Sequence, residues 1–439
     1  MMPAMTIRVG VIGKDGRTSA IEKCLSMSDR VERVVLLSTG KASSPAALFE
    51  AVSERVREHQ PAFVVVGPEE PLARGIVDHL WSAHRIPCVG PTASLARLEA
   101  SKAFTRTLLA THGIPGNPRH RVFESIEGIV AYLRELGEFV VKPDGLTGGK
   151  GVKVWGDHLH SIAEALDYCD ELLRVPDSRI VIEERLDGEE FSLQSFCDGS
   201  HVVHMPPVQD HKRAYEGDTG PNTGGMGSYS CADHSLPFLE PDVLHAAREI
   251  NTRVARALFE ETGEKYKGVL FGGFMATQRG VRLLEYNARF GDPESLNVLS
   301  LLDTSFVDIC EGIVNETLDR VAVTFRHAAS VCKYIVPQGY PGKPVVGARA
   351  DLSNVPPESA NLRIYRAAID DRDEMTGSRA IAFVGIADTL SEAETIAERA
   401  ASAVQGKVWH RTDIGTAALV QKRVDHMTAL RALASRSSV

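Results

Sequence analysis

Apolar runs alternate with helical patterns through the N-terminal part of the chain. The runs predict three strands, at Ile7–Ile12, 34–37 and 62–66. The intervening stretches predict helices that end near residue 27 and cover 46–58 and 72–83. Strands that alternate with helices form a parallel sheet covered by helices. This part is therefore predicted to be a parallel α/β unit.

The turns that follow these strands are candidate ligand sites, because ligands of such sheets lie beyond the carboxyl ends of the strands. Gly13, Gly16 and Arg17 follow the first strand, and Glu69 follows the third. The spacing of the two glycines lacks the Gly-x-Gly of a dinucleotide fingerprint, so no nicotinamide cofactor is predicted. These turns either bind a ligand or simply need glycine for their geometry.

A glycine-rich turn joins two short apolar strands at residues 139–154, FVVKPDGLTGGKGVKV. The first strand ends in Lys142, and the turn carries Lys150 among four glycines. Glycine lets backbone N–H groups approach phosphate oxygens closely. The lysine precedes the last glycine and a strand pattern follows, which excludes a Walker A motif. We predict a hairpin flap over a nucleotide; a plain glycine-rich turn is the alternative.

The patterns continue on both sides of this hairpin. A helical period over 93–111 predicts one helix that contains Lys102. Residues 180–186 predict a strand, and strict alternation over 190–196 predicts another that is half buried. The longest helical stripe covers Pro241–Thr262 and belongs to the core, and a closing helix is predicted over 303–314.

A polar stretch in the middle of the chain is a candidate substrate site. The basic pair Lys212 and Arg213 precedes residues 218–227, DTGPNTGGMG. A glycine- and asparagine-rich loop beside a basic cluster can receive a small anionic substrate. A flexible surface loop is the alternative.

Residues 281–294, VRLLEYNARFGDPE, carry the densest chemistry. On a strand, Glu285 and Asn287 point to one side, together with Leu283 and Arg289. Carboxylate and amide oxygens suit Mg²⁺, which binds one or two protein ligands together with phosphate oxygens. Arg289 can fork onto a carboxylate or phosphate. A strand with a solvated polar face is the alternative.

Length and composition bound the class of protein. The 439 residues are too many for one core, so several packed units are expected. Beyond residue 326 the pattern predicts a compact α+β unit, with short strands at 330–336, 363–368 and 379–385 and a helix over 391–404. The net charge of −9 gives no bulk reason to expect nucleic-acid binding. No apolar run approaches the roughly 18 residues of a membrane span, and the start lacks a signal-peptide pattern. Seven scattered cysteines without a C-x-x-C spacing indicate reduced thiols, so we expect a cytoplasmic location.

These stretches together resemble the ATP-grasp ligases and, within them, the phosphoribosylamine–glycine ligase family. The matching segments span most of 60–300: GPEEPLARGIVD at 67–78, GPTASLARLEASKAFT at 90–105, KPDGLTGGKGV at 142–152, VIEERLDGEE at 181–190, QDHKR at 209–213, DTGPNTGGMGSY at 218–229 and EYNARFGDPE at 285–294. DTGPNTGGMG and RFGDPE are specific to this ligase within the superfamily. RTDIG at 411–415 is also similar.

The resemblance implies a multidomain α/β and α+β fold. It implies a pre-ATP-grasp domain at 1–98, an ATP-grasp domain at 99–325 whose flap covers about 118–187, and a C-terminal α+β domain at 326–439. It also implies an ADP-forming reaction of purine biosynthesis, in which glycine is activated as an acyl phosphate and coupled to 5-phosphoribosylamine. ATP and Mg²⁺ or Mn²⁺ are the implied cofactors, the partners are small molecules, and a monomer is expected.

The resemblance also implies roles for single residues. Catalysis is assigned to Lys142, Asp210 and Arg289, and metal binding to Glu285 and Asn287. ATP binding is assigned to Lys102, Lys142, Gly145, Gly148, Gly149, Lys150, Gly151, Glu183, Glu184, Leu186 and Glu190. Substrate binding is assigned to Asp210, Lys212, Arg213, Asn222, Gly224, Gly225, Met226, Arg289, Gly291, Asp292, Gly13, Gly16, Arg17 and Glu69.

The N-terminal loops depart from the family pattern. The family's first loop usually reads Gly-x-Gly-Gly-Arg-Glu-His, whereas residues 13–19 read GKDGRTS, and STGK at 38–41 replaces an asparagine-rich loop. These loops help the family to hold phosphoribosylamine. Two alternatives therefore stay open: a ligase that joins glycine, or a similar amino acid, to a different amine, and a non-catalytic ATP-binding regulator.

Overall fold

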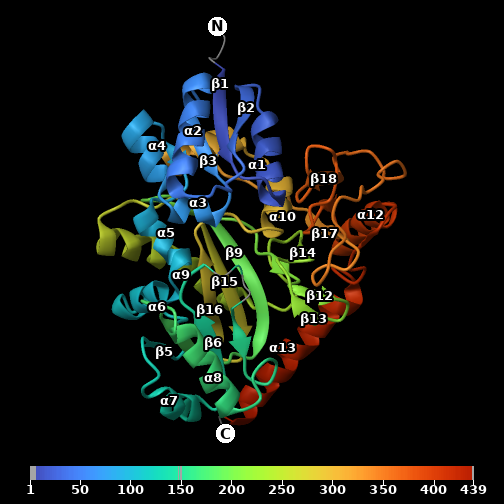
Figure 1. Cartoon of the computed structure of the whole chain (residues 1–439). Coiled ribbons are helices and arrows are strands. Elements are labelled where there is room, and N and C mark those ends of the chain that lie inside the picture. Colours follow the sequence, from blue (N-terminus) through green and yellow to red (C-terminus); the bar gives the residue numbers. More distant parts are fainter. Residues whose placement is uncertain (1–5, 147, 149–150, 438–439) are drawn as a thin grey trace.

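The computed structural model describes residues 6–146, 148 and 151–437. An N-terminal unit (blue in Figure 1) lies above a central unit (green and yellow), and a C-terminal unit (orange and red) lies beside the central one. In the described part of the chain, no helix combines the length and apolar character that a membrane span needs.

The N-terminal unit confirms the predicted parallel α/β arrangement. Its four parallel strands lie in the order β2-β1-β3-β4. The strands are β1 (Ile7–Ile12), β2 (Val31–Ser38), β3 (Phe63–Val66) and β4 (Cys88–Val89), and the helices are α1 (Gly16–Ser26), α2 (Pro45–His59), α3 (Glu69–Ala73) and α4 (Ile76–His84). Asp15 caps α1, because its side chain accepts hydrogen bonds from the backbone N–H and hydroxyl of Thr18.

The single helix predicted over 93–111 is wrong. The structure has α5 (Ala93–Ala100) and α6 (Lys102–Thr111), separated by Ser101 in an extended conformation. The Ser101 hydroxyl accepts a hydrogen bond from the backbone N–H of Phe104 and donates one to Asp144. The serine therefore starts a second helix, as N-cap residues do, and places Lys102 at its first position.

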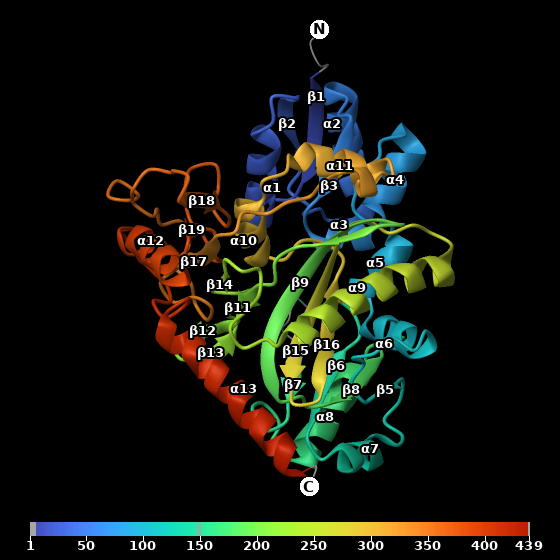
Figure 2. The same ribbon diagram turned by 180° about the vertical axis from the view of Figure 1, so that it is seen from behind.

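Two antiparallel sheets build the central unit. One has the order β10-β9-β15-β16 and the other β5-β8-β6-β7. Their strands are β5 (His120–Phe123), β6 (Phe139–Pro143), β7 (Lys153–Val154), β8 (Ile180–Glu184), β9 (Gly188–Asp198), β10 (Val202–His204), β15 (Lys267–Thr277) and β16 (Gly280–Asn287). Helices α7 (Ile129–Leu136) and α8 (Ile162–Leu173) pack on the smaller sheet, and α9 (Pro241–Thr262) crosses a face of the larger one (Figure 2). The pairing of β6 with β7 confirms the predicted hairpin.

Strand β9 was predicted to be half buried, and this is wrong. Every residue from Phe191 to Asp198 is buried. The strand lies between β10 and β15, and α9, α11 (Phe306–Val314) and α13 (Ala417–Ser437) also pack against it. The alternation of polar and apolar residues does not mark a solvated face here, because other units cover that face.

Helix α7 and two further helices have no counterpart in the sequence-based prediction. All eight residues of α10 (Glu294–Leu301) are buried, so the helix has no polar stripe that would reveal its period. Helix α13 follows the edge of the central unit toward the C-terminus (Figures 1 and 2) and contacts it partly through charges. Arg423 and His426 of α13 lie 3.3 and 2.7 Å from the carboxylate of Glu189 on β9.

The C-terminal sheet recruits strands from the middle of the chain. Its order is β11-β14-β17-β19-β18, and β20 also pairs with β17. The strands are β11 (Gln209–Asp210), β14 (Gly227–Ser230), β17 (Ala329–Pro337), β18 (Leu362–Arg366), β19 (Ile381–Ala387) and β20 (Val408–Trp409), with α12 (Leu390–Ser402) packed on β17 and β19. The candidate substrate loop at 218–227 therefore ends at a strand of the C-terminal sheet.

Candidate active site

A β-bulge at Leu284 sets the direction of the candidate metal ligands. The pairing of β16 with β15 shifts by one residue between Leu283 and Glu285. Leu283 and Tyr286 are buried in the same core cluster, whereas the Glu285 side chain is 42% exposed. The prediction that Leu283 shares the face of Glu285 is wrong, because the extra residue reverses the alternation. Glu285 and Asn287 lie beyond the bulge and share a face.

That face has room for a cation. The register partner of Glu285 is Gly273, and a Cβ atom at this glycine would lie 3.4 Å from Cγ of Glu285. Glycine therefore leaves the carboxylate accessible from the neighbouring strand. The donor set of one carboxylate and one amide oxygen fits a divalent cation that completes its coordination with phosphate oxygens.

The bulge also exposes a backbone carbonyl that joins the two central sheets. Leu284 O accepts hydrogen bonds from Arg106 Nη2 at 2.7 Å and from Lys142 Nζ at 3.1 Å. Lys142 is on β6 of the smaller sheet, and Arg106 is on α6. A residue left unpaired by the bulge thus positions the predicted phosphate-binding lysine.

The Glu183 carboxylate forms ion pairs with both Arg106 and Lys142. Its carboxylate lies 2.6 Å from Arg106 Nε and 2.7 Å from Lys142 Nζ, and its side chain is 3% exposed. Burial would raise the pKa of Glu183, but the charges of Arg106 and Lys142 outweigh it and lower the pKa to about 2. Both carboxylate oxygens are used by the protein, so in this structure Glu183 orients Lys142 and does not face a ligand.

Three ammonium groups gather around Glu285. Burial raises its pKa, yet the charges of Lys212, Lys142 and Lys102 outweigh burial and hold the pKa below its ordinary value. Lys212 Nζ lies 3.1 Å from Glu190 and 3.9 Å from Glu285, and the charge of Glu190 raises the pKa of this lysine. Lysines from three different elements thus converge beside oxygen donors, an arrangement that can neutralise a polyphosphate.

Two glycines in the described part of the flap have free space around their backbone. Gly145 has φ +129° and Gly148 has φ +57°, and a Cβ atom at either position would meet nothing within 4 Å. Lys102 Nζ donates a hydrogen bond to Gly145 O, and the Tyr168 hydroxyl donates one to Gly151 O. The predictions for Gly149 and Lys150 lie outside the described residues.

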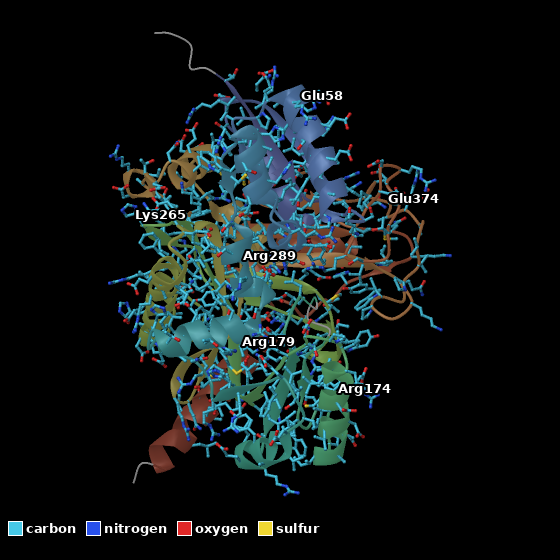
Figure 3. All side chains as sticks on the ribbon, turned by 60° about the vertical axis from the view of Figure 1, so that its left-hand side comes forward. Glu58, Arg174, Arg179, Lys265, Arg289 and Glu374 are labelled. Atoms are coloured by element: carbon cyan, nitrogen blue, oxygen red, sulfur yellow. The ribbon has the colours of Figure 1, made fainter. Side chains whose placement is uncertain are left out.

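Arg289 lies at the centre of the molecule, where the N-terminal and central units meet (Figure 3). It reaches Glu99 at 2.8 Å, Glu69 at 3.2 Å and the Asn287 amide oxygen at 3.1 Å. The charges of Arg289 and Arg17 outweigh the effect of burial on Glu69 and lower its pKa. The structure thus brings Glu69 and Arg17, which follow strands of the first unit, next to the face that carries Asn287.

The substrate loop meets the 289–292 turn. A Cβ atom at Gly225 would lie 2.5 Å from Asp210 Oδ1 and 2.6 Å from Pro293 Cδ, so the loop backbone packs directly against these two side chains, and Pro293 immediately follows the turn. Met226 is fully buried. A Cβ atom at Gly16 would clash with the Tyr334 hydroxyl and lie 3.2 Å from Asp292 Oδ1. The candidate residues of three units therefore meet at this turn.

A half-buried and a buried acid, Asp210 and Glu294, lie near this contact. Burial and the nearby charge of Glu294 raise the pKa of Asp210 well above its ordinary value, although Lys212 and Arg379 act in the opposite direction. Burial likewise raises the pKa of Glu294. A raised pKa suits a carboxyl group for proton transfer to or from a substrate. Sequence reasoning missed Glu294 and Arg379 as members of the site.

The remaining predicted residues lie around this centre. The Glu184 carboxylate accepts hydrogen bonds from the backbone N–H and from Nε of Arg119. Leu186 lies in the connection from β8 to β9. Arg213 pairs with Asp157 at 3.1 Å, and Asn222 is exposed on the short β13 (Thr219–Asn222). No described interaction joins these residues to the 289–292 turn.

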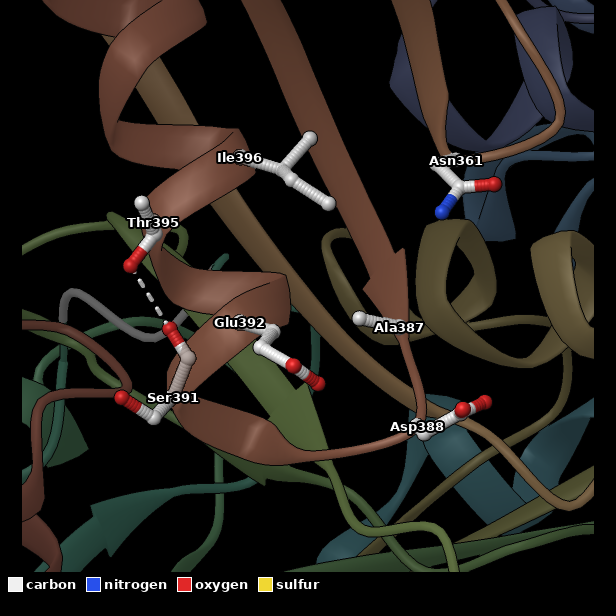
Figure 4. A pocket seen from close by; sticks show the side chains of 7 residues that line it. All are labelled: Asn361, Ala387, Asp388, Ser391, Glu392, Thr395 and Ile396. Carbon is white, nitrogen blue, oxygen red and sulfur yellow. Dashed lines mark hydrogen bonds between the residues drawn. The ribbon is translucent and has the colours of Figure 1, made fainter.

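A pocket of about 480 Å³ on the C-terminal unit lies apart from this site. Figure 4 shows that it opens between the end of β19 and the start of α12. Its lining residues are Asn361, Ala387, Asp388, Ser391, Glu392, Thr395 and Ile396. This lining holds two carboxylates and no lysine or arginine among the described residues, so it does not suit a phosphorylated ligand.

Comparison with known proteins agrees with this geometry. Residues 7–99, 100–295 and 330–417 match the N, ATP-grasp (A) and C domains of phosphoribosylglycinamide synthetase. The chain belongs to the phosphoribosylglycinamide synthetase family. The ATP-grasp domain of this family implies ATP binding and the use of a divalent metal.

Relatives match over nearly the whole chain. The phosphoribosylamine–glycine ligases of Methanothermobacter thermautotrophicus and Methanosarcina barkeri are 47% and 45% identical, over 97% of this chain and all of each relative. The crystal structure of the Thermotoga maritima phosphoribosylamine–glycine ligase is 27% identical with a TM-score of 0.74, over 93% of this chain and all of that chain. A biotin carboxylase from Campylobacter jejuni shares the fold at 14% identity, with a TM-score of 0.68 over 97% of this chain and 96% of that chain.

The Glu183 ion pairs predict a pH-dependent contribution to stability. The folded pKa of about 2 lies below the ordinary value of 4.5, so the contribution is present above pH 4.5 and is lost as the pH falls toward 2. We expect Glu183→Gln to lower the free energy of unfolding of the central unit by about 3 kcal/mol at pH 7. The difference from the parent should shrink as the pH falls from 4.5 to 3.

Trp155 packs on Phe139 and reports on this unit, so urea unfolding can be followed by its fluorescence after replacement of Trp81 and Trp409. Glu124→Gln, at an exposed position of the same unit, is the matched control. A Glu183→Gln variant as stable as this control would contradict the prediction.

The donor pair on β16 predicts a metal-binding defect. Glu285→Gln should weaken Mn²⁺ binding in the presence of ATP by more than about tenfold, because even loss of an outer partner of a metal ligand has an effect of this size. Electron paramagnetic resonance of free Mn²⁺ measures the affinity. Glu261→Gln, on an exposed part of α9, should leave it unchanged; equal affinity in both variants would reject Glu285 as a ligand.

Proposed function

We propose that the protein is an ADP-forming phosphoribosylamine–glycine ligase. The observation that carries this proposal is the packing of Gly225, in the 218–227 loop, against Asp210 and Pro293, close to the lysines and oxygen donors around Glu285. The names of the full-length relatives support the same activity. The reaction activates the glycine carboxylate with ATP and then transfers the acyl group to the amine.

Lys102 and Lys142 bind the phosphates of ATP, and Glu183 keeps Lys142 oriented toward them. Glu285 and Asn287 hold Mg²⁺ or Mn²⁺, which supplies positive charge to the phosphate oxygens. The flap at 145–151 closes over the nucleotide and excludes water. Positioning and charge stabilisation carry most of the rate in such a transfer.

Arg289 and the 218–227 loop place glycine and its acyl phosphate, and the amine then displaces phosphate. The attacking amine loses a proton in this step. Asp210 lies beside Gly225 and Glu294 beside Gly291, and whichever of these carboxyl groups is ionised can accept this proton. No side-chain nucleophile is needed.

The N-terminal turn at 13–17 selects the amine. Arg17 is held by Asp15 at 2.7 Å and donates to Phe290 O at 2.9 Å, so it shapes this turn from within. Lys14 is 40% exposed and pairs with Asp371 of the C-terminal unit. Because this turn departs from the family pattern, an acceptor other than phosphoribosylamine is the second candidate. The third, a non-catalytic regulator, is disfavoured by the converging lysines.

The predicted domain boundaries, at 98 and 325, stay proposals, as do a monomer and a cytoplasmic location. The cation that occupies the site, Mg²⁺ or Mn²⁺, is also a proposal.

The proposed reaction predicts that ADP release requires Mg-ATP, glycine and an amine together. Phosphoribosylamine generated in the assay should support release with glycinamide ribonucleotide as product, which mass spectrometry identifies. Release with other amines but not with phosphoribosylamine would favour the second candidate. Failure with every amine would favour the regulator.

The buried position of Arg17 predicts a selective effect on the amine. Lysine cannot form the forked contacts of the guanidinium, so Arg17→Lys should raise KM for the amine by about tenfold and leave KM for ATP within about twofold. Arg33→Lys changes an exposed arginine of the same unit and serves as the control. An equal rise of both KM values would argue against an acceptor role for this turn.

A further inference from the structure

Arg379 reaches from the C-terminal unit into the contact between the substrate loop and the 289–292 turn. Its Nη1 atom donates to Gly224 O at 2.8 Å, Gly225 O at 3.2 Å and Asp292 O at 2.7 Å. It also lies 3.3 Å from Asp292 Oδ1. One cation thus ties together two backbone segments that are about 70 residues apart in sequence.

The guanidinium is itself held in place. Its side chain is 15% exposed, and its centre lies 4.8 Å from the ring centroid of Tyr334. The Tyr334 hydroxyl donates to Asp292 Oδ1 at 2.6 Å. Aromatic stacking and a shared carboxylate leave the arginine little freedom to turn away.

The C-terminal unit holds the beginning of the same loop as well. Arg411 is fully buried and lies 3.1 Å from Asp218, and Arg423 of α13 also pairs with Asp218. Both ends of the loop are therefore fixed by arginines that follow it by more than 150 residues. The loop itself is rich in glycine, so its backbone has no strong preference of its own.

We propose that Arg379 is a positioning residue of the ligase site, which holds the Gly224–Gly225 turn against Asp210 and Asp292 so that the loop can receive the glycine acyl group. This inference rests on the proposed function for the identity of the ligand. The ATP-binding lysines lie on other elements, so the loss of Arg379 acts on glycine and not on ATP. The C-terminal unit thereby completes a site whose chemistry resides in the central unit.

Steady-state kinetics of the full-length chain tests the proposal. Arg379→Met should raise KM for glycine and lower kcat, each by about tenfold, with KM for ATP within about twofold. Arg379→Lys should recover part of the loss, because an ammonium group can still donate to the carbonyl oxygens. Arg372→Met removes a 73% exposed arginine of the same unit and should change neither constant.

An unchanged KM for glycine in a folded Arg379→Met variant, or an equal rise in KM for ATP, would overturn the proposal. If that variant does not fold, Arg379→Lys must show a smaller selective rise in KM for glycine. Absence of glycine-dependent ADP release in the parent protein would instead reject the proposed function. Amide hydrogen exchange over 218–227 tests in that case whether Arg379 holds the loop. Exchange should be at least about tenfold faster in the Arg379→Met variant than in the parent protein. Equal exchange in the two proteins would overturn the positioning role.

Discussion

The 289–292 turn is the constraint on which the arrangement of the three units depends. It is largely buried, so its backbone groups need partners within the protein. Phe290 O accepts from Arg17 of the first unit, Gly291 N–H donates to Gln194 of the central sheet, and Tyr334 of the C-terminal sheet donates to Asp292. Each unit therefore supplies a hydrogen bond to the turn. Displacement of any one unit would remove a partner from a largely buried polar group.

The same turn lies between the lysines proposed to bind phosphate and the loop proposed to bind substrate. On one side, the strand before it carries the bulge whose carbonyl orients Arg106 and Lys142. On the other side, Arg379 links Asp292 O to the carbonyl oxygens of Gly224 and Gly225 in the glycine-rich loop. The site combines several buried charges, and each has an opposite charge within reach. Such charges are costly to bury singly, so the site is stable only when all three units are in place.

Periodicity and local motifs predicted much of this structure. The parallel N-terminal sheet, the hairpin flap and the long helix α9 follow from patterns that are local in the chain. The errors arose where local pattern and tertiary context differ. Ser101 starts a new helix with the help of Asp144, which is distant in sequence. Strand β9 is covered on both faces by elements from elsewhere, and α10 is buried on all sides, so neither shows the pattern of a half-solvated element.

Short contiguous stretches of the sequence predict the candidate chemistry: the lysines of the flap and of α6, the Glu-x-Asn pair and the two segments characteristic of the family. Strand alternation alone places Glu285 and Asn287 on one face. Which charges face each other depends on the packing of the three units. Packing places Glu183 in an ion pair with Lys142 and brings Arg379 to the candidate substrate loop. The bulge at Leu284 reverses the alternation of side chains along the strand. Contacts between residues far apart in sequence are set by packing, and no local periodicity encodes them.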